Sequence, residues 1–256
     1  MATIPSPRSS TARGDGRALD ALREIRFETG YIAHHPGSVL VSFGATKVLC
    51  VATAEERVPP HRKESGGGWV TAEYAMLPGS THDRKQRERQ KQDGRSVEIQ
   101  RLIGRALRNV VDCDLIGQRQ ITVDCDVIQA DGGTRTASIT GGFVALAICL
   151  HSLQQRKMPM KAKTLRDAVK AQVAAVSLGI LGGQVLTDLC YDEDRHAETD
   201  LNLVARSDGG LIEVQGTAEG APLHRRELDQ LVDQGLLAIE ILCAKQREAL
   251  QGIWLL

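Results

Sequence analysis

One stretch organises this chain: Gln129-Ala130-Asp131-Gly132-Gly133-Thr134-Arg135-Thr136-Ala137-Ser138. It lies between a β-like run, residues 121–128, and a helix-like run, residues 139–153. A strand that turns through two glycines into a helix directs unpaired backbone N–H groups outward, and the helix dipole adds positive charge there. Thr134 contributes a hydroxyl, and Arg135 contributes a fork of donors that fits phosphate. The stretch therefore predicts a phosphate-binding loop, and an ordinary turn with a threonine cap is the alternative.

The composition is that of an ordinary globular protein. The 256 residues are 42% hydrophobic, 25% charged and 3% aromatic, enough for one large α/β domain or two small ones. Because 32 Lys and Arg balance 32 Asp and Glu, the net charge of zero argues against a polyanion partner unless the charges are locally separated. Since aromatic residues are scarce, any bound nucleic acid must be held mainly through its backbone charge.

The cysteines and the first residues indicate a cytoplasmic protein. Six cysteines lie in apolar stretches without a C-x-x-C pair: Cys50, Cys113, Cys125, Cys149, Cys190 and Cys243. We expect buried, reduced thiols and no zinc site. Residues 1–18 lack the apolar segment of a secretory signal peptide, and no run approaches the length of a membrane span. We therefore expect no membrane partner.

Hydrophobic patterning predicts strands and helices along the whole chain after a flexible arm, residues 1–13. The predicted strands are 38–42, 47–53, 69–77, 121–128, 172–180, 184–189, 201–205 and 211–214, of which six form hairpins. The predicted helices are 96–111 with Ser96 as N-cap, 139–153, and 222–250 with Pro222 in its first turn. This order predicts two sheets with packing helices.

Positive charge gathers in the middle of the chain. Residues 81–108 hold nine Lys or Arg against four Asp or Glu, and five of the basic residues, Arg84, Lys85, Arg87, Arg89 and Lys91, lie within eight positions. Either this is a solvated charged loop, or it is a mobile basic loop over a site for a polyanionic substrate. Arg95 follows at the start of the predicted helix, so it can join Arg135 in clamping one anion.

Negative charge gathers in residues 191–200, where five of ten side chains are carboxylates. If this segment is strand-like, Asp194 and Asp200 share one face, because an even spacing returns side chains to the same side of a strand. Two carboxylates suit Mg²⁺, which keeps most of its waters and takes further oxygen ligands from a phosphate. An exposed acidic turn is the alternative interpretation, and we expect His196 at the surface.

Six stretches carry a resemblance to a known family. They are Gly16-Arg17 and residues 67–74, 76–78, 98–103, 124–141 and 212–220. In these stretches the chain resembles the ribonuclease PH family of phosphate-dependent 3′→5′ exoribonucleases, and its bacterial members more than the larger polynucleotide phosphorylases. The resemblance runs from about residue 14 to residue 250.

The resemblance implies the fold and the assembly. The family has an α/β (α+β) fold of the ribosomal protein S5 domain 2 type, with two βαβ-type halves and packing helices in one compact chain. Here these are a first half, residues 14–155, a linker, 156–166, and a second half, 167–251, followed by a tail, 252–256. The family assembles as a homo-hexameric ring made as a trimer of dimers.

The resemblance also implies the site. Phosphate is held in the family by the residues matching Arg95, Gly133, Thr134 and Arg135, while those matching Asp194 and Asp200 serve Mg²⁺ and the chemistry. We expect RNA contacts from the basic loop, at Arg84, Arg87 and Arg89. The implied reaction trims the 3′ trailer of tRNA precursors with inorganic phosphate as co-substrate. It releases nucleoside diphosphates and can run backward.

Two departures and two alternatives accompany the resemblance. Gly79 stands where many members carry an arginine, and Arg195-His196 replaces small residues between the two aspartates. A non-catalytic RNA-binding ring subunit, as in the exosome, would be marked by loss of the site arginines or aspartates, which are present here. A small-molecule phosphotransferase would not need the basic run that precedes Arg95.

Overall fold

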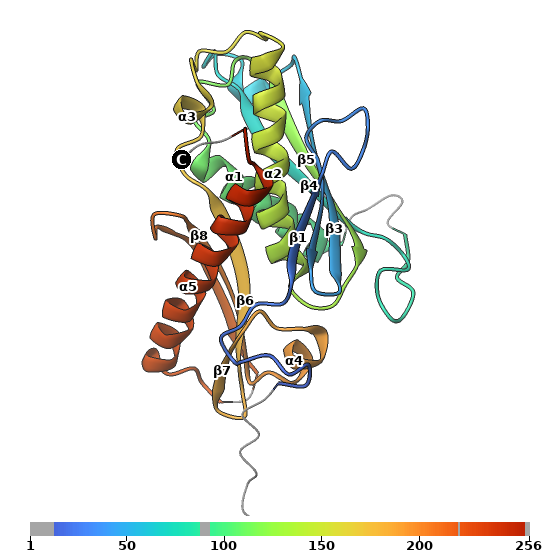
Figure 1. The fold of residues 1–256 in the computed structure, drawn as a ribbon, viewed down its shortest axis with the longest axis vertical. Helices are drawn as coiled ribbons and strands as arrows, with labels where there is room; N and C mark the ends of the chain where they lie inside the picture. The colour runs from blue at the N-terminus through green and yellow to red at the C-terminus, as the bar shows by residue number, and fades with distance from the viewer. Residues whose placement is uncertain (1–12, 88–92, 220, 254–256) are drawn as a thin grey trace, which may run out of the picture.

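The computed structural model describes residues 13–87, 93–219 and 221–253, which form two β-sheets with a long helix between them (Figure 1). The first half contains β1 (Ile25–Thr29), β2 (Ser38–Phe43), β3 (Thr46–Glu55), a 3₁₀ turn (Pro60–Arg62), β4 (Trp69–Met76), α1 (Gly94–Val110), β5 (Gln120–Gln129) and α2 (Thr134–Gln155). The second half contains α3 (Leu165–Ala168), β6 (Val173–Leu181), β7 (Gln184–Thr187), α4 (Tyr191–His196), β8 (Thr199–Arg206), β9 (Leu211–Ala218) and α5 (Arg225–Ala249).

The first sheet has the strand order β1-β2-β3-β5-β4, in which β4 runs parallel to β5 and the other neighbours are antiparallel. Side chains alternate along β5. Ile121, Val123, Cys125 and Val127 are buried, and the residues that lie between them are partly exposed. Such a period of two belongs to a strand with one face in the core. α1 packs against β4, and α2 packs against β2, β3 and β5.

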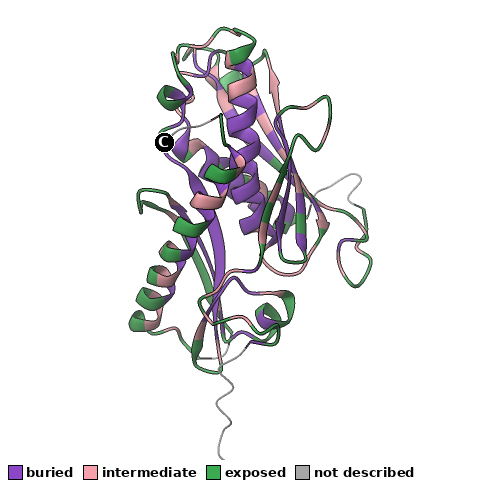
Figure 2. Ribbon diagram, in the orientation of Figure 1, coloured by how far each residue is buried: buried purple, intermediate pink, exposed green. Residues whose placement is uncertain are grey.

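The second sheet is antiparallel, with the order β7-β6-β8-β9. Nearly all of β6 is buried, because α2 and α5 both pack against it. α5 directs Leu231, Ile239 and Leu242 into the core and leaves its other face exposed (Figure 2). The expected α/β architecture, two sheet-containing halves with packing helices in a single compact chain, is confirmed.

The central helix α2 departs from one sequence-based expectation. Its most apolar stretch of 18 residues has a mean hydropathy of 1.6. The expectation that no run approaches the length of a membrane span is therefore wrong for this helix. However, 89% of that stretch is buried inside the fold. A helix that is apolar all round needs cover on every side, and here both sheets supply that cover.

Several element boundaries also differ from the prediction. Asp93, not Ser96, is the N-cap of α1, and its carboxylate accepts a hydrogen bond from the Ser96 backbone N–H at 2.6 Å. α2 begins five residues early, at Thr134, because its polar first turn masks the apolar period. Pro222 precedes α5, whose N-cap is His224. β1, α3 and α4 were not predicted, since each is too short to show a period of its own.

The cysteines follow the prediction in part. All six are free thiols, and Cys50, Cys125, Cys149 and Cys243 are buried. Burial raises the pKa of the Cys149 thiol to about 11 and that of the Cys243 thiol to about 12. These thiols therefore stay protonated and unreactive at neutral pH. The expectation of burial is wrong for Cys113 and Cys190, which are partly exposed at the ends of loops.

Candidate active site

The glycine loop forms at the end of β5 as the sequence predicts. Gly132 and Gly133 have φ values of 73° and 64°, in the left-handed region that favours glycine. Gly133 is the N-cap of α2 and carries no capping side chain, so the first N–H groups of the helix have no side-chain acceptor. A Cβ atom on Gly132 would lie 2.5 Å from the carbonyl oxygen of Leu189, so the loop must approach the second half of the chain closely.

The two polar residues of the loop are held by neighbouring elements. The hydroxyl of buried Thr134 lies 2.9 Å from the Tyr74 hydroxyl on β4. Burial raises the pKa of Tyr74, so its hydroxyl keeps the proton needed for this hydrogen bond at neutral pH. Arg135 donates to the Gln215 amide oxygen on β9 at 2.5 Å and lies 3.6 Å from the Glu98 carboxylate on α1. The arginine is thus oriented by strand and helix together.

One pocket of about 380 Å³ brings the predicted site residues together. The pocket is lined by all six residues predicted for phosphate binding and catalysis: Arg95, Gly133, Thr134, Arg135, Asp194 and Asp200. Of the other lining residues, Ala130 and Gly132 belong to the predicted phosphate-binding loop and Lys85 to the basic run, whereas no site role was predicted for Met76, Thr81, Ser177, Tyr191 and Asn202. Cationic and anionic side chains therefore meet around one cavity, and the role of each residue stays a prediction.

Asp194 and Asp200 reach the pocket by a route that the sequence did not predict. The segment is not strand-like throughout: Asp194 lies on the short helix α4, and Asp200 is the second residue of β8. Carboxylates in the first turn of α4 favour the helix, because its N-terminus carries positive charge. Ala197 ends α4 in an extended conformation and leads into β8, on which Asp200 lines the same pocket.

The pKa values of both carboxyl groups are raised. Burial and then the charge of Asp194 raise the pKa of Asp200 to about 6. Burial also raises the pKa of Asp194, against the opposing charges of Arg95 and Arg135. Two partly desolvated carboxylates are disfavoured when both are ionised, so the pocket favours either protonation of one of them or a cation nearby.

The donor set fits a magnesium ion. Asp194 and Asp200 supply carboxylate oxygens, and Asn202 lines the same pocket two residues further along β8. Within residues 13–87, 93–219 and 221–253, no group of three or more His, Cys, Asp or Glu forms a metal site. Mg²⁺ suits a pair of carboxylates better than such a cluster, because it keeps several waters and shares a substrate phosphate.

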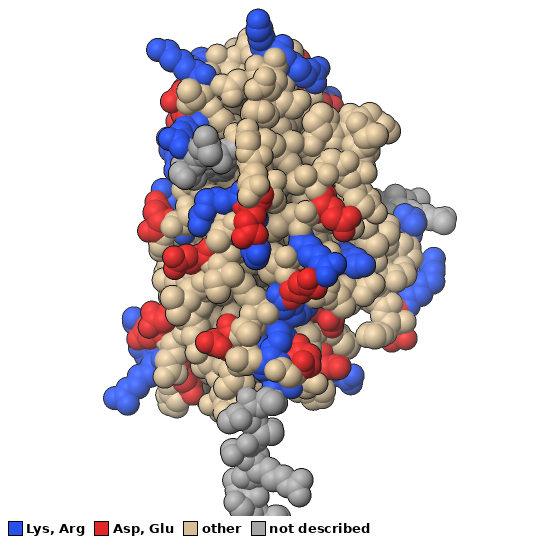
Figure 3. Space-filling model, in the orientation of Figure 1, with Lys and Arg blue, Asp and Glu red and all other residues tan. Residues whose placement is uncertain are grey.

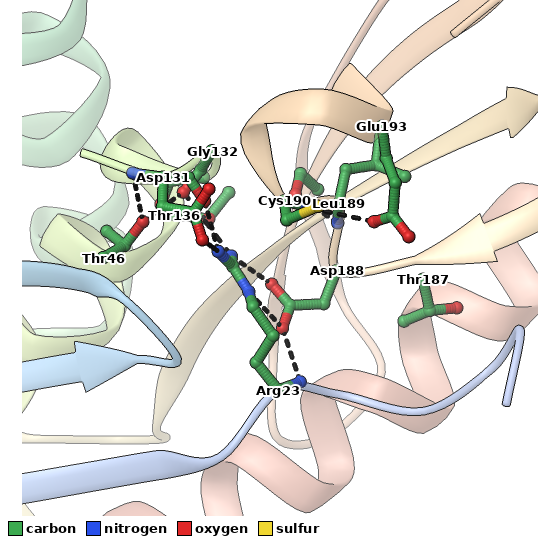
Figure 4. Close-up of polar contacts among 12 residues, drawn as sticks. Arg23, Thr46, Asp131, Gly132, Thr136, Thr187, Asp188, Leu189, Cys190 and Glu193 are labelled. Carbon is green, nitrogen blue, oxygen red and sulfur yellow. Dashed lines mark hydrogen bonds and ion pairs between the residues drawn. The ribbon is translucent and has the colours of Figure 1, made fainter. Parts of the chain in front are cut away.

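A buried ion pair holds the glycine loop against the second half (Figure 4). Arg23 donates to both carboxylate oxygens of Asp188, at 3.0 and 2.7 Å. The same guanidinium donates to the carbonyl oxygens of Asp131 and Gly132. The Thr46 hydroxyl donates to the Gly132 carbonyl at 2.7 Å and accepts from the Asp131 N–H. The loop is therefore fixed by residues that do not themselves line the pocket.

A second arginine fixes α4, which carries Asp194. Arg13 binds both oxygens of the Glu193 carboxylate and donates to the carbonyls of Thr187 and Asp188 at 2.6 and 2.9 Å. The prediction of a flexible arm over residues 1–13 is therefore wrong for Arg13, which is buried, while residues 1–12 lie outside the described chain. Sequence reasoning missed this contact, although the two arginines flanking Gly14-Asp15-Gly16 were a usable signal.

The basic loop lies only partly within the described chain. Lys85 lines the pocket, while Arg84 and Arg87 are exposed and do not line it. The third predicted RNA contact, Arg89, lies outside the described residues. On the face shown in Figure 3, basic and acidic side chains are interspersed, as expected for a net charge of zero. The predicted charge separation therefore concerns this loop and not that whole face.

Comparison with known families identifies the class of protein. Residues 21–150 match the 3′ exoribonuclease family, domain 1, and residues 171–237 match the 3′ exoribonuclease family, domain 2. Both are domains of the ribonuclease PH type, and together they cover more than half of the chain. The chain therefore belongs to the ribonuclease PH-type 3′ exoribonuclease family, as the sequence motifs predicted.

Solved structures with the same fold include exosome subunits. A crystal structure of rice (Oryza sativa) Rrp46 is similar with a TM-score of 0.75 and 18% identity, covering 93% of this chain and 100% of that chain. The Archaeoglobus fulgidus exosome with RNA bound to the active site and an archaeal exosome core are similar with TM-scores of 0.72 and 0.71. Each is 21% identical and covers 93% of this chain and 92% of that one. At these identities the likeness shows the shared fold.

Proposed function

We propose that this protein is a phosphorolytic 3′→5′ exoribonuclease of the bacterial ribonuclease PH kind. The observation that carries the proposal is the meeting of Arg95, the glycine loop with Arg135, and the Asp194–Asp200 pair in one pocket. A phosphate ion fits between the arginines and the N-terminus of α2, since both attract anions. The acidic pair then faces the position where an RNA 3′ end would react.

The reaction joins two anions, so charge neutralisation and positioning dominate it. An oxygen of inorganic phosphate forms a bond to the phosphorus between the last two nucleotides, and the bond from that phosphorus to the penultimate 3′ oxygen breaks. The products are a nucleoside 5′-diphosphate and an RNA one nucleotide shorter, whose 3′ oxygen takes up a proton. Arg95, Thr134, Arg135 and the N–H groups that follow Gly133 hold the attacking phosphate.

The acidic pair serves the leaving oxygen. When no metal is bound, burial and the charge of Asp194 raise the pKa of Asp200 to about 6, so this carboxyl is one candidate to donate the proton that the 3′ oxygen requires. Asp194 is the other candidate donor, because burial raises its pKa as well. Both residues would hold Mg²⁺, which supplies positive charge near the leaving oxygen when it is bound.

The finer assignments rest on the family. We propose that the substrates are tRNA precursors with 3′ trailers, that the protein acts in the cytoplasm, and that it forms a homo-hexameric ring as a trimer of dimers. The shared fold with the RNA-bound exosome of Archaeoglobus fulgidus supports an RNA substrate and a ring-type assembly. Light scattering or native mass spectrometry tests the hexamer directly.

A non-catalytic ring subunit is the second candidate, favoured by the fold shared with rice Rrp46. The intact constellation of two arginines and two aspartates argues against it, because a subunit that only binds RNA needs no pair of perturbed carboxyl groups. A small-molecule phosphotransferase is the third, and the basic residues before Arg95 argue against that one.

The decisive experiment is RNA degradation with and without inorganic phosphate. Unstructured RNA with a 5′ label should shorten only when phosphate is added, and the released products should be nucleoside 5′-diphosphates. Excess diphosphate should drive the reverse addition of nucleotides to the 3′ end. Release of monophosphates in phosphate-free buffer would overturn phosphorolysis, and complete inertness toward RNA with phosphate and Mg²⁺ would favour the non-catalytic subunit.

A further inference from the structure

Two aromatic rings meet at the edge of the pocket. Tyr191, the first residue of α4, lines the pocket and is 41% exposed. Its ring centroid lies 5.7 Å from that of His82, with the planes tilted by 50°. His82 belongs to the loop after β4, which also contributes Thr81 and Lys85 to the pocket lining. Segments more than one hundred residues apart therefore place their rings together beside the site.

The position of Tyr191 is unusual for this chain. Among the described residues, Phe43, Tyr74 and Phe143 are buried in the core and Phe27 packs against it. Among the described residues, the exposed Phe, Tyr and Trp side chains are Tyr31 and Tyr191, and of these Tyr191 lines the pocket. A single exposed ring is ordinary on a protein surface. Because Tyr191 lines the same pocket as the two site aspartates, a ligand bound in that pocket can contact its ring.

The ring is fixed relative to the glycine loop. The Tyr191 backbone N–H donates to the Asp131 carboxylate at 3.1 Å. Gly132 packs so closely that a Cβ atom there would lie 3.0 Å from the Tyr191 nitrogen. In the same first turn of α4, Glu193 is bound by Arg13. The backbone that carries the ring is therefore held at a set distance from the predicted phosphate position.

We propose that Tyr191, backed by His82, is a stacking platform for the base of the 3′-terminal nucleotide of RNA. The inference rests on the proposed function, because phosphorolysis requires the terminal nucleoside inside the pocket with its 5′ phosphorus beside the bound phosphate. An enzyme that removes successive nucleotides must accept every base. Stacking meets that need, since each base has a π face, whereas hydrogen bonds to base edges would favour some bases over others.

Fluorescence of a terminal 2-aminopurine tests the platform without any chemistry. An oligonucleotide carrying 2-aminopurine at its 3′ end is titrated with protein in phosphate-free buffer that contains Mg²⁺. Stacking on Tyr191 should quench the fluorescence of the parent protein and of Tyr191→Phe, which keeps the ring. Tyr191→Leu should lose the quench, while the matched control Tyr31→Leu, the other exposed tyrosine, should keep it. A quench that persists in Tyr191→Leu overturns the platform.

Steady-state kinetics give the second readout. Stacking of one base typically changes affinity by about 5- to 150-fold, so Tyr191→Leu should raise the KM for a short RNA by roughly 10-fold or more and leave the KM for phosphate unchanged. Tyr191→Phe should restore the parent KM. Circular dichroism and light scattering check that the variants keep their fold and assembly. An equal rise in the KM for phosphate would instead mean that the substitution disturbs the whole pocket and would overturn the proposal.

The two proposals fail separately. If the terminal base is quenched by the parent and not by Tyr191→Leu, but RNA is degraded without phosphate, then the platform stands and phosphorolysis falls. If degradation requires phosphate and Tyr191→Leu still quenches the terminal base, then phosphorolysis stands and the platform falls. The same oligonucleotide serves both measurements.

Discussion

Asp200 is the residue whose charge state the pocket perturbs most clearly. Substitution Asp200→Asn keeps the side-chain shape but removes a metal ligand and a proton donor, so turnover should fall by roughly 100-fold or more. RNA affinity, measured by fluorescence anisotropy, should stay nearly unchanged. The matched control is Asp192→Asn, an exposed carboxylate on α4 that does not line the pocket. Lost RNA binding with preserved turnover would contradict the assignment.

Arg135 should affect the binding of phosphate and not the binding of RNA. Arg135→Ala removes a charged hydrogen-bond donor, which typically costs about 1.5–3 kcal/mol, so the KM for phosphate should rise by roughly 10- to 150-fold. Arg135→Lys keeps the charge but loses the fork of donors, so its KM for phosphate should lie between that of the parent and that of Arg135→Ala. Arg101→Ala, an exposed arginine on α1 outside the pocket, is the control. An unchanged KM for phosphate would place the anion elsewhere.

Asp124 makes stability depend on pH. It faces Glu73 across the β4–β5 pair, and burial, Glu73 and Asp126 raise its pKa from 3.8 to about 6. The native state then holds a proton that the unfolded chain releases, so stability falls as pH rises from about 4 to about 6. Asp124→Asn should flatten this slope and stabilise the protein at pH 7 by roughly 1 kcal/mol after allowance for solvent screening. Urea unfolding of the parent and of Asp124→Asn from about pH 4 to pH 7 tests this prediction. An equal destabilisation of the variant at both ends of this pH range would refute it.

At the scale of elements, the connection from β7 to α4 depends on the ion pair between Arg23 and Asp188. Asp188 is fully buried with a φ of 58°, a conformation that asparagine also tolerates, so Asp188→Asn removes charge without backbone strain. The substitution removes the nearer counter-charge of the buried Arg23 guanidinium and leaves the Asp131 carboxylate at 3.8 Å, and loss of one partner of a buried pair typically costs about 3–5 kcal/mol. Urea unfolding should show this loss, whereas Asp15→Asn, which breaks the more exposed Arg17 pair, should cost about 1 kcal/mol or less.

Local patterns predicted most elements because their causes are local. The glycine pair at Gly132 and Gly133 marks a left-handed turn wherever it stands, and the alternation of Val123 and Val127 with polar neighbours marks a strand with one buried face. Gly182 and the glycine that follows it turn the β6–β7 hairpin through positive φ in the same way. These signals are complete within a few residues, so the sequence carries them without the rest of the fold.

The missed features depend on contacts between distant residues. The bond from Arg13 to Glu193 spans 180 positions, and the arginines that flank Gly14-Asp15-Gly16 indicate a contact but not its partner. His82 and Tyr191 are also far apart in the sequence, and their rings meet only in the folded chain. The pairing of Asp194 with Asp200 was predicted for the wrong reason, since a helical turn, and not a strand, brings them together.

At the scale of the whole molecule, zero net charge and an RNA substrate are compatible only if binding charge is local. Arg84 and Arg87 are exposed and lie close in the sequence to Lys85 of the pocket lining, so we expect a single strand that ends in the pocket to contact them. Contacts of this kind hold RNA backbone and carry no sequence information. They should therefore show themselves in salt dependence, because each phosphate neutralised on a single strand contributes about 0.7 to the slope of log affinity against log salt.

The double substitution Arg84→Ala/Arg87→Ala should lower that slope by up to about 1.4 and weaken binding of a long RNA. Binding of a very short oligonucleotide and its phosphate requirement should not change, because the short chain ends before the loop. Fluorescence anisotropy over a salt series measures the slope, after light scattering has shown equal assembly states. Arg225→Ala/Arg226→Ala on exposed α5 removes the same charge and is the control, so that a slope lowered equally by both pairs would reflect net charge alone. A slope that the Arg84→Ala/Arg87→Ala substitution leaves unchanged would mean that these arginines form a solvated surface without RNA contacts.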